Sequence, residues 1–247
     1  MSAAWTTTSG PTNPVKRVIG DKRVLAVVPA RGGSRGLPRK NIRMVAGKPL
    51  LAYTIDAALR SQYTDRIVVS SEDSEILDIA AKCGAEALRR PEHLAADDTP
   101  GAAPAVHAIE VLPGFDIVVL LQPTSPLRSP ADIDGCIEGC LASGLAACVS
   151  VVQASEHPYW MFTLTNEETL QPVVPFAGRI AAKRQDLPTA YLLNGAVYAA
   201  GCAWLVREGT FVRPGVRGWV MPVERSIDID AESDLAEFSR IALQKKS

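Results

Sequence analysis

The chain has 247 residues, of which 47% are apolar and 21% are charged, and its formal net charge is −1. This length suits one large domain, and the composition is ordinary for a soluble globular protein. The near-zero charge excludes a global field that would attract nucleic acid, and no apolar run reaches the ~18 residues of a membrane-spanning helix. We therefore expect neither a nucleic-acid partner nor a membrane partner.

The first 22 residues are rich in Ser, Thr, Gly and Pro and contain no apolar core. We interpret residues 1–22 as a disordered tail rather than a secretory signal, and residues 23–247 as the folded domain. The five cysteines are an odd number, which fits a reduced, cytoplasmic chain. Cys136 and Cys140 lie one helical turn apart without the further Cys or His of a zinc set, so we expect them in the core.

Short apolar segments alternate with amphipathic ones along most of the chain. The predicted strands cover residues 24–30, 66–71, 85–90, 116–121, 147–152 and 191–200, with a last strand ending near Pro222. The predicted helices cover residues 49–61, 73–84, 105–111, 132–142 and 232–246. This rhythm predicts an α/β fold with a doubly wound, mostly parallel sheet, in which ligands bind beyond the carboxyl ends of the strands. Residues 153–190 break the rhythm, and such an excursion indicates a lid, a partner surface, or both.

The first strand runs directly into a glycine-rich basic loop, residues 31–41. Its glycines let the backbone approach a ligand, and the cations Arg31, Arg35, Arg39 and Lys40 would surround that ligand with positive charge. Such a loop favours a polyphosphate, although a solvated basic turn is the simpler alternative. The spacing matches neither the Walker A pattern nor G-x-G-x-x-G, so the loop would be a nucleotide site of another kind.

Two carboxylates stand two residues apart near the C-terminus, in Asp228-Ile229-Asp230. In an extended segment both would face one side while Ile229 faces the core, and such a pair beside a polyphosphate indicates Mg²⁺. The alternative is that Asp230 merely precedes or caps the last helix.

Two further polar sites lie on predicted strands. Gln122 follows the clearest one, so its amide either orients a substrate or belongs to an ordinary turn flanked by proline. The pair Asn194-Gly195 is either a polar reader of a ligand or a bulge.

Five segments, in order, resemble the acylneuraminate (CMP-sialic acid) cytidylyltransferases. They are Val27-Val28-Pro29-Ala30-Arg31-Gly32-Gly33-Ser34-Arg35-Gly36-Leu37-Pro38-Arg39-Lys40-Asn41, Leu121-Gln122-Pro123-Thr124-Ser125-Pro126-Leu127-Arg128, Arg184-Gln185-Asp186-Leu187-Pro188, Asn194-Gly195-Ala196-Val197-Tyr198 and Ser226-Ile227-Asp228-Ile229-Asp230. The resemblance implies a Rossmann-like nucleotidyltransferase fold over residues 23–247. It also implies a Mg²⁺-dependent enzyme that uses CTP, releases pyrophosphate and forms a homodimer.

The resemblance also implies roles for individual residues. The residues for the CTP phosphates and ribose are Arg31, Gly32, Gly33, Ser34, Arg35, Lys40 and Asn41, and Arg90 would help to hold the cytosine. Asp228 and Asp230 would hold the metal and, with Arg31 and Lys40, form the catalytic set. The acceptor side would comprise Gln122, Arg184, Gln185, Asn194 and Tyr198, and the excursion at about 153–190 would supply the dimer contact.

One departure concerns the acceptor. The family commonly has Arg-x-Asn-Gly, whereas this chain has Leu192 at the position of that arginine. The expected acceptor is a small anionic sugar acid of the sialic, legionaminic or pseudaminic type. Leu192 motivates an alternative, cytidylyl transfer to a phosphonate such as phosphonoformate, and a third hypothesis is a nucleotide-binding module without catalysis.

Overall fold

The computed structural model describes residues 19–33, 36–175 and 183–244. Its centre is a seven-stranded sheet of order β11-β7-β10-β6-β1-β4-β5. The strands are β1 (Val24–Pro29), β4 (Arg66–Ser71), β5 (Glu86–Arg89), β6 (Ile117–Leu120), β7 (Ala147–Gln153), β10 (Tyr191–Gly201) and β11 (Arg217–Val220). Strand β10 is antiparallel to β6 and β7, and the other pairs are parallel. The predicted mostly parallel α/β sheet is therefore confirmed.

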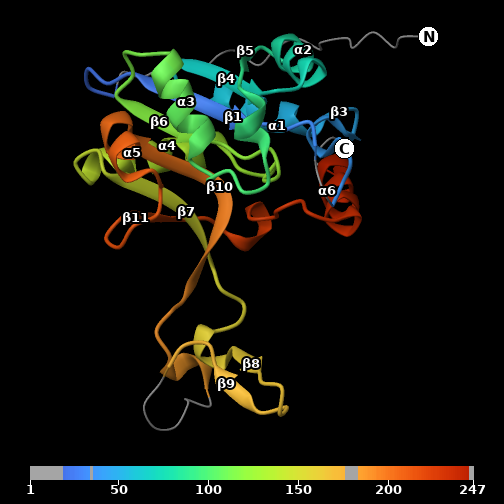
Figure 1. Ribbon diagram of the computed structural model, residues 1–247, viewed down its shortest axis with the longest axis vertical. Coiled ribbons are helices and arrows are strands. Elements are labelled where there is room, and N and C mark those ends of the chain that lie inside the picture. Colours follow the sequence, from blue (N-terminus) through green and yellow to red (C-terminus); the bar gives the residue numbers. More distant parts are fainter. Residues whose placement is uncertain (1–18, 34–35, 176–182, 245–247) are drawn as a thin grey trace.

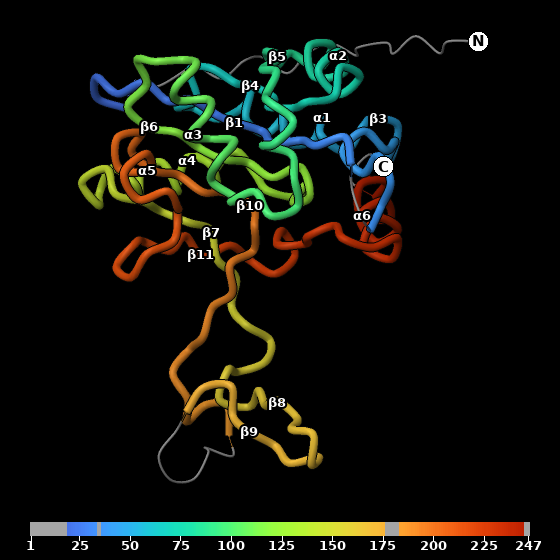
Figure 2. The backbone as a smooth tube through the Cα atoms, in the orientation of Figure 1, coloured from blue at the N-terminus to red at the C-terminus, as the bar shows by residue number. Residues whose placement is uncertain are grey.

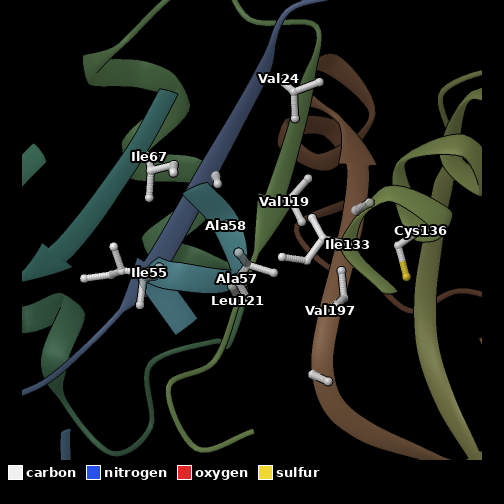
Figure 3. Packing of buried hydrophobic residues seen from close by; sticks show 14 of the residues in the cluster. Val24, Ile55, Ala57, Ala58, Ile67, Val119, Leu121, Ile133, Cys136 and Val197 are labelled. Atoms are coloured by element: carbon white, nitrogen blue, oxygen red, sulfur yellow. The ribbon is translucent and has the colours of Figure 1, made fainter. Parts of the chain in front are cut away.

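Helices cover both faces of this sheet (Figure 1). Residues of α1 (Leu50–Leu59), α2 (Ser74–Lys82) and α4 (Pro130–Ala142) pack on one face, in the cluster that includes Ile55, Val119 and Ile133. Figure 3 shows these apolar side chains meeting between the helices and the strands. Helices α3 (Ala103–Val111) and α5 (Cys202–Glu208) cover the other face. Cys136 and Cys140 are fully buried in the first cluster, as expected.

A third apolar cluster brings the C-terminal part of the chain beside the loop that follows β1. It joins α6 (Glu232–Gln244) to the hairpin of β2 (Met44–Val45) and β3 (Lys48–Pro49), and Phe238 meets Tyr53 edge to face at 4.8 Å between ring centroids. Ile229 and Leu37 are buried in the same cluster. Hydrophobic packing thus places the Asp228–Asp230 segment against the basic loop.

Local capping explains where two of the predicted helices begin. The side chain of Asp73 accepts hydrogen bonds from the backbone N–H groups of Glu75 and Ile76, and it is the N-cap of α2. Ser129 and Asp132 form a reciprocal capping box at the start of α4. Helix α5 and the β2–β3 hairpin are not among the predicted elements, because their segments are too short to show a periodicity.

The excursion is an arm that projects from one end of the sheet (Figures 1 and 2). Strands β7 and β10 continue into it as an antiparallel ribbon, and it carries the hairpin of β8 (Phe162–Leu164) and β9 (Leu170–Pro172). Short 3₁₀ turns lie at Pro158–Trp160 and Arg184–Asp186. Its exposed apolar side chains include Met161, Phe162, Leu164, Leu170, Val173, Tyr191, Leu192 and Leu193.

Most of the predicted tail, residues 1–18, lies outside the described residues. In its described part, Ile19 and Lys22 form an isolated β-bridge. Among the described residues, no helix is long and apolar enough to cross a membrane.

Candidate active site

A cavity of about 380 Å³ lies at the carboxyl edge of the sheet. Five predicted site residues line it, namely Arg31, Lys40, Asn41, Arg90 and Gln122. They come from segments that follow β1, β5 and β6, which are far apart in the sequence. The parallel sheet brings them together because the carboxyl ends of parallel strands share one edge.

The cations at this cavity are held by acidic groups of the protein. Nη1 of Arg31 donates to Oδ1 of Asp97 at 2.6 Å, and Asp97 belongs to the loop that precedes α3. Lys40 begins a 3₁₀ turn (Lys40–Ile42), and its Nζ donates to the carbonyl oxygen of Ile229 at 2.7 Å and to Asp230 Oδ1 at 3.0 Å. Lys40 therefore ties the basic loop to the twin-carboxylate segment.

The glycine-rich loop is fixed by acidic residues that follow β4. The backbone N–H of Gly32 donates to Glu72 Oε1 at 2.6 Å. A Cβ at Gly32 would lie 2.5 Å from Asp73 Oδ2, so glycine is needed for this close approach. Gly33 is exposed with open space around it, whereas the predicted phosphate contacts Ser34 and Arg35 lie outside the described residues.

The expectation that Arg39 contributes positive charge to the ligand is wrong. Its guanidinium forms ion pairs with Asp73 and Glu75 instead. These contacts raise the pKa of Arg39, and the hydrogen bond from Arg39 helps to lower the pKa of Asp73 against the opposing effect of its burial. Arg39 thus braces the loop against the start of α2 and does not line the cavity.

Asp228 and Asp230 both reach solvent, and Ile229 between them is fully buried, as predicted. Partial burial raises the pKa of the Asp228 carboxyl, and the charge of Asp230 raises it further. The hydroxyl of Thr124 and the charge of Lys40 act in the opposite direction. Asp230 does precede α6, but its carboxylate accepts from Lys40 Nζ, and among the described residues no N–H group of the first turn of α6 donates to it, so a capping role has no support.

This donor set fits a divalent cation. Two carboxylates that repel one another are the oxygen ligands that Mg²⁺ takes together with phosphate oxygens and water, and a cation between them would relieve the repulsion that raises the Asp228 pKa. No group of three or more His, Cys, Asp or Glu residues able to hold a metal occurs in the described part of the chain. The protein would therefore supply two ligands and leave the remaining positions to substrate and water.

Asn41 and Gln122 line the same cavity. Asn41 is buried, and its amide donates to the carbonyl oxygen of Arg31 at 2.9 Å, so it also holds the loop in place. The Oε1 atom of Gln122 accepts from Thr124 Oγ1 at 3.4 Å and lies beside Gly195 of β10.

The Asn194-Gly195 pair forms a bulge in β10, where the register with β7 shifts and Gly195 has a φ of +72°. The side chain of Asn194 is buried and bonded within the protein: it accepts from Ser150 Oγ at 2.6 Å and donates to Ser226 Oγ at 2.9 Å. Asn194 thereby connects β10 to the segment that leads to Asp228. Burial raises the pKa of Tyr198, and the charge of Asp228 adds to this effect.

The remaining acceptor-side predictions fall elsewhere. Arg184 and Gln185 line a second cavity of about 520 Å³ in the arm, together with His157 and Lys183. The guanidinium of Arg184 donates to the carbonyl oxygens of Ala154 and Ser155. Within this chain, Arg184 and Gln185 do not meet Gln122 at the crevice.

The sequence predicts no individual role for Arg128, which supports the loop that carries Gln122. Arg128 is buried and donates to the carbonyl oxygens of Ala196 and Gln122 and to Thr54 Oγ1. Burial lowers the pKa of Arg128 to about 9. The sequence shows an arginine in a turn flanked by prolines. It does not show which groups this arginine bonds, because Ala196 and Thr54 are 68 and 74 residues away along the chain.

A cation-lined crevice beside a pair of carboxylates, at the carboxyl edge of this sheet, defines a nucleotidyltransferase. The fold agrees with two solved structures at low identity. CMP:2-keto-3-deoxy-manno-octonic acid synthetase complexed with CTP aligns with a TM-score of 0.71 and 16% identity, over 90% of this chain and 99% of the other. The 4-diphosphocytidyl-2C-methyl-D-erythritol synthase of Anaerococcus prevotii aligns with a TM-score of 0.61 and 14% identity, over 90% and 96% of the two chains.

The chain belongs to the cytidylyltransferase family, whose model matches residues 25–165, and it is a CTP-dependent nucleotidyltransferase. The CMP-N,N'-diacetyllegionaminic acid synthase of Legionella pneumophila is 35% identical over 87% of this chain and 94% of its own length. The pseudaminic acid cytidylyltransferase of Campylobacter jejuni is 35% identical over 88% and 94%. The N-acylneuraminate cytidylyltransferase of Escherichia coli is 32% identical over 91% of this chain and 53% of its own length.

Proposed function

We propose that this cytidylyltransferase moves CMP from CTP to a nonulosonic acid of the sialic, legionaminic or pseudaminic type and releases pyrophosphate, with Mg²⁺ as its cofactor. The names of three relatives at 32–35% identity support this class of acceptor. The observation that carries the proposal is the contact of Lys40 with Ile229 and Asp230 at the rim of the cavity. This contact joins the proposed phosphate-binding cation to the segment that carries the two proposed metal-binding carboxylates.

The cavity lining supports the assignment of the nucleotide site. Arg31 and Lys40 are cations at its wall, and Gly33 of the loop that follows β1 has open space around it, so a phosphate can approach the backbone there. The proposed nucleotide contacts are Arg31, Gly32, Gly33, Ser34, Arg35, Lys40 and Asn41 for the phosphates and ribose and Arg90 for the cytosine. The ion pair with Asp97 uses Nη1 of Arg31, so the other donors of this guanidinium are left for a phosphate.

The reaction is an in-line attack of the acceptor oxygen on the α-phosphorus of CTP. Arg31 and Lys40 stabilise the negative charge that moves onto the pyrophosphate as the bond to the α-phosphorus breaks. Asp228 and Asp230 would hold Mg²⁺, which supplies charge neutralisation between an anionic acceptor and an anionic triphosphate.

The acceptor site and the homodimer are part of the same proposal. Gln122 lines the nucleotide cavity, whereas Arg184 and Gln185 line the cavity in the arm. Asn194 and Tyr198 of β10 are the other proposed acceptor contacts. Exposed apolar side chains along the arm support its role as the dimer contact within residues 153–190 and the adjoining ribbon. Cysteines that are all free in the described part of the chain support a cytoplasmic location.

A panel of acceptors tests the proposal. Pyrophosphate release is measured with CTP, Mg²⁺ and sialic, legionaminic or pseudaminic acid, and phosphonoformate is included because Leu192 replaces the arginine that the family commonly has. We expect turnover with at least one nonulosonic acid and none with phosphonoformate. No turnover of any nonulosonic acid refutes the acceptor class, and no turnover of any acceptor supports a non-catalytic module.

The variant Asp230→Ala tests the metal site in the same assay. We expect it to lose turnover and the response to added Mg²⁺. Wild-type activity in this variant with Mg²⁺ present would show that Asp230 does not hold the metal.

A further inference from the structure

The carboxylate of Glu72 connects three neighbouring strand ends. Glu72 is the first residue after β4, and its side chain is 17% exposed. Its Oε1 accepts the backbone N–H of Gly32, after β1, at 2.6 Å. Its Oε2 accepts from Nε and Nη2 of Arg90, after β5, at 3.1 and 3.0 Å. One charged group therefore fixes both the glycine-rich loop and an arginine of the cavity wall.

Arg90 needs such a partner because its side chain is only 3% exposed. A buried guanidinium without a counter-charge is costly, and a fork bound along one edge is held in one orientation. Glu72 accepts from the Nε and Nη2 atoms of Arg90, whereas Nη1 makes no hydrogen bond with any described residue. Arg90 lines the cavity and Glu72 does not, so the carboxylate supports the arginine from outside the ligand site.

We propose that Glu72 is a positioning residue that sets the discrimination between CTP and other pyrimidine nucleotides by orienting Arg90 and by linking it to the phosphate loop. This inference rests on the proposed contact of Arg90 with the cytosine. A guanidinium offers donors only, which suits the N3 and O2 acceptors of cytosine. Uracil has an N–H donor at N3, so a fixed guanidinium opposes it, whereas a mobile one can move away. An Arg90 side chain held in one orientation therefore makes the site prefer cytosine to uracil.

Equilibrium binding of CTP and UTP by isothermal titration calorimetry tests this role without any acceptor. In Glu72→Gln the amide has one oxygen for two donors, so either Gly32 or Arg90 loses its bond. If the displaced Arg90 then loses one charge-assisted hydrogen bond to the cytosine, the Kd for CTP rises by ~10- to 100-fold. We expect the preference for CTP over UTP to fall by ~10-fold or more, because the Kd for UTP rises less.

Two companion variants sharpen the test. Glu92→Gln removes an exposed carboxylate two residues beyond Arg90 and is expected to leave both Kd values unchanged. Glu72→Asp keeps the charge on a shorter side chain that cannot reach both partners, so its CTP preference should lie between those of the wild type and Glu72→Gln. If Glu72→Gln does not fold, Glu72→Asp decides the question, and an unchanged preference in it overturns the inference.

The variant Arg90→Gln separates the base contact of Arg90 from the positioning role of Glu72. If it lowers the CTP preference while Glu72→Gln weakens CTP and UTP binding equally, the base contact stands and the positioning role is refuted. If Arg90→Gln leaves the preference unchanged, the proposed base contact is itself wrong and the inference is overturned with it. A fall in preference in both variants, with no further fall in the double variant, supports the coupling of Glu72 to Arg90.

Discussion

Replacing Arg128 by methionine removes the buried guanidinium that fixes the loop after β6. Three acceptors lose their donor, namely the carbonyl oxygens of Ala196 and Gln122 and Thr54 Oγ1. Each bond to a charged donor contributes about 1.5–3 kcal/mol. Much of this sum is offset because the variant no longer buries a cation, the cost that lowers the pKa of Arg128 to about 9. We expect a net loss of about 3 kcal/mol in the free energy of unfolding.

For a chain of 247 residues, this loss corresponds to a fall in Tm of about 6–12 °C. Differential scanning calorimetry measures it, with Arg60→Met as the matched control, because Arg60 is exposed at the end of α1. The control should change the free energy of unfolding by no more than about 0.5 kcal/mol. A Tm for Arg128→Met within about 2 °C of the control would refute this account of the buried arginine.

Three further outcomes follow from the structure. Lys40→Met should lower kcat/KM for CTP by ~100-fold or more, since it removes a charge that stabilises the departing pyrophosphate; a loss below tenfold would contradict that role. The raised pKa of Asp228 predicts that Mg²⁺ affinity falls, as pH is lowered, at a higher pH than for an ordinary aspartate, which calorimetric titration of Mg²⁺ at several pH values would check. Burial would raise the pKa of Asp132, but the hydrogen bond from Arg225 and further bonds lower it below its ordinary value. Ionised Asp132 therefore stabilises the folded protein at neutral pH, and this stabilisation is lost as the pH falls through the folded-state pKa of Asp132. Asp132→Asn should therefore cost about 3 kcal/mol at neutral pH, and less near pH 3, in denaturant titrations; an equal cost at both pH values would exclude the charge effect.

The order and type of the elements could be predicted because each central strand is a buried apolar run and each long helix has an apolar face. Strands β1, β4 and β6 lie within one residue of their predicted bounds. The antiparallel direction of β10 could not be predicted, because strand direction depends on how the arm returns the chain to the sheet.

The candidate site divides in the same way. The residue types of the basic loop predict phosphate binding, and the spacing of Asp228 and Asp230 predicts metal binding. Both predictions can be made from the sequence because each pattern lies within a few neighbouring residues. The neutralisation of Arg39 by Asp73 and Glu75 could not be anticipated, because it depends on where α2 begins relative to the loop.

The amino-acid sequence by itself determined the kind of fold, the charge of the basic loop and the outward direction of the two carboxylates around the buried Ile229. Only the tertiary structure decided which acidic group pairs with each cation, as Glu72 pairs with Arg90 and Asp97 pairs with Arg31. The physical reason is distance: an ion pair forms within a few ångströms, and these partners are 18 and 66 residues apart along the chain. Parallel strands place their ends at one edge and thereby bring such partners into contact.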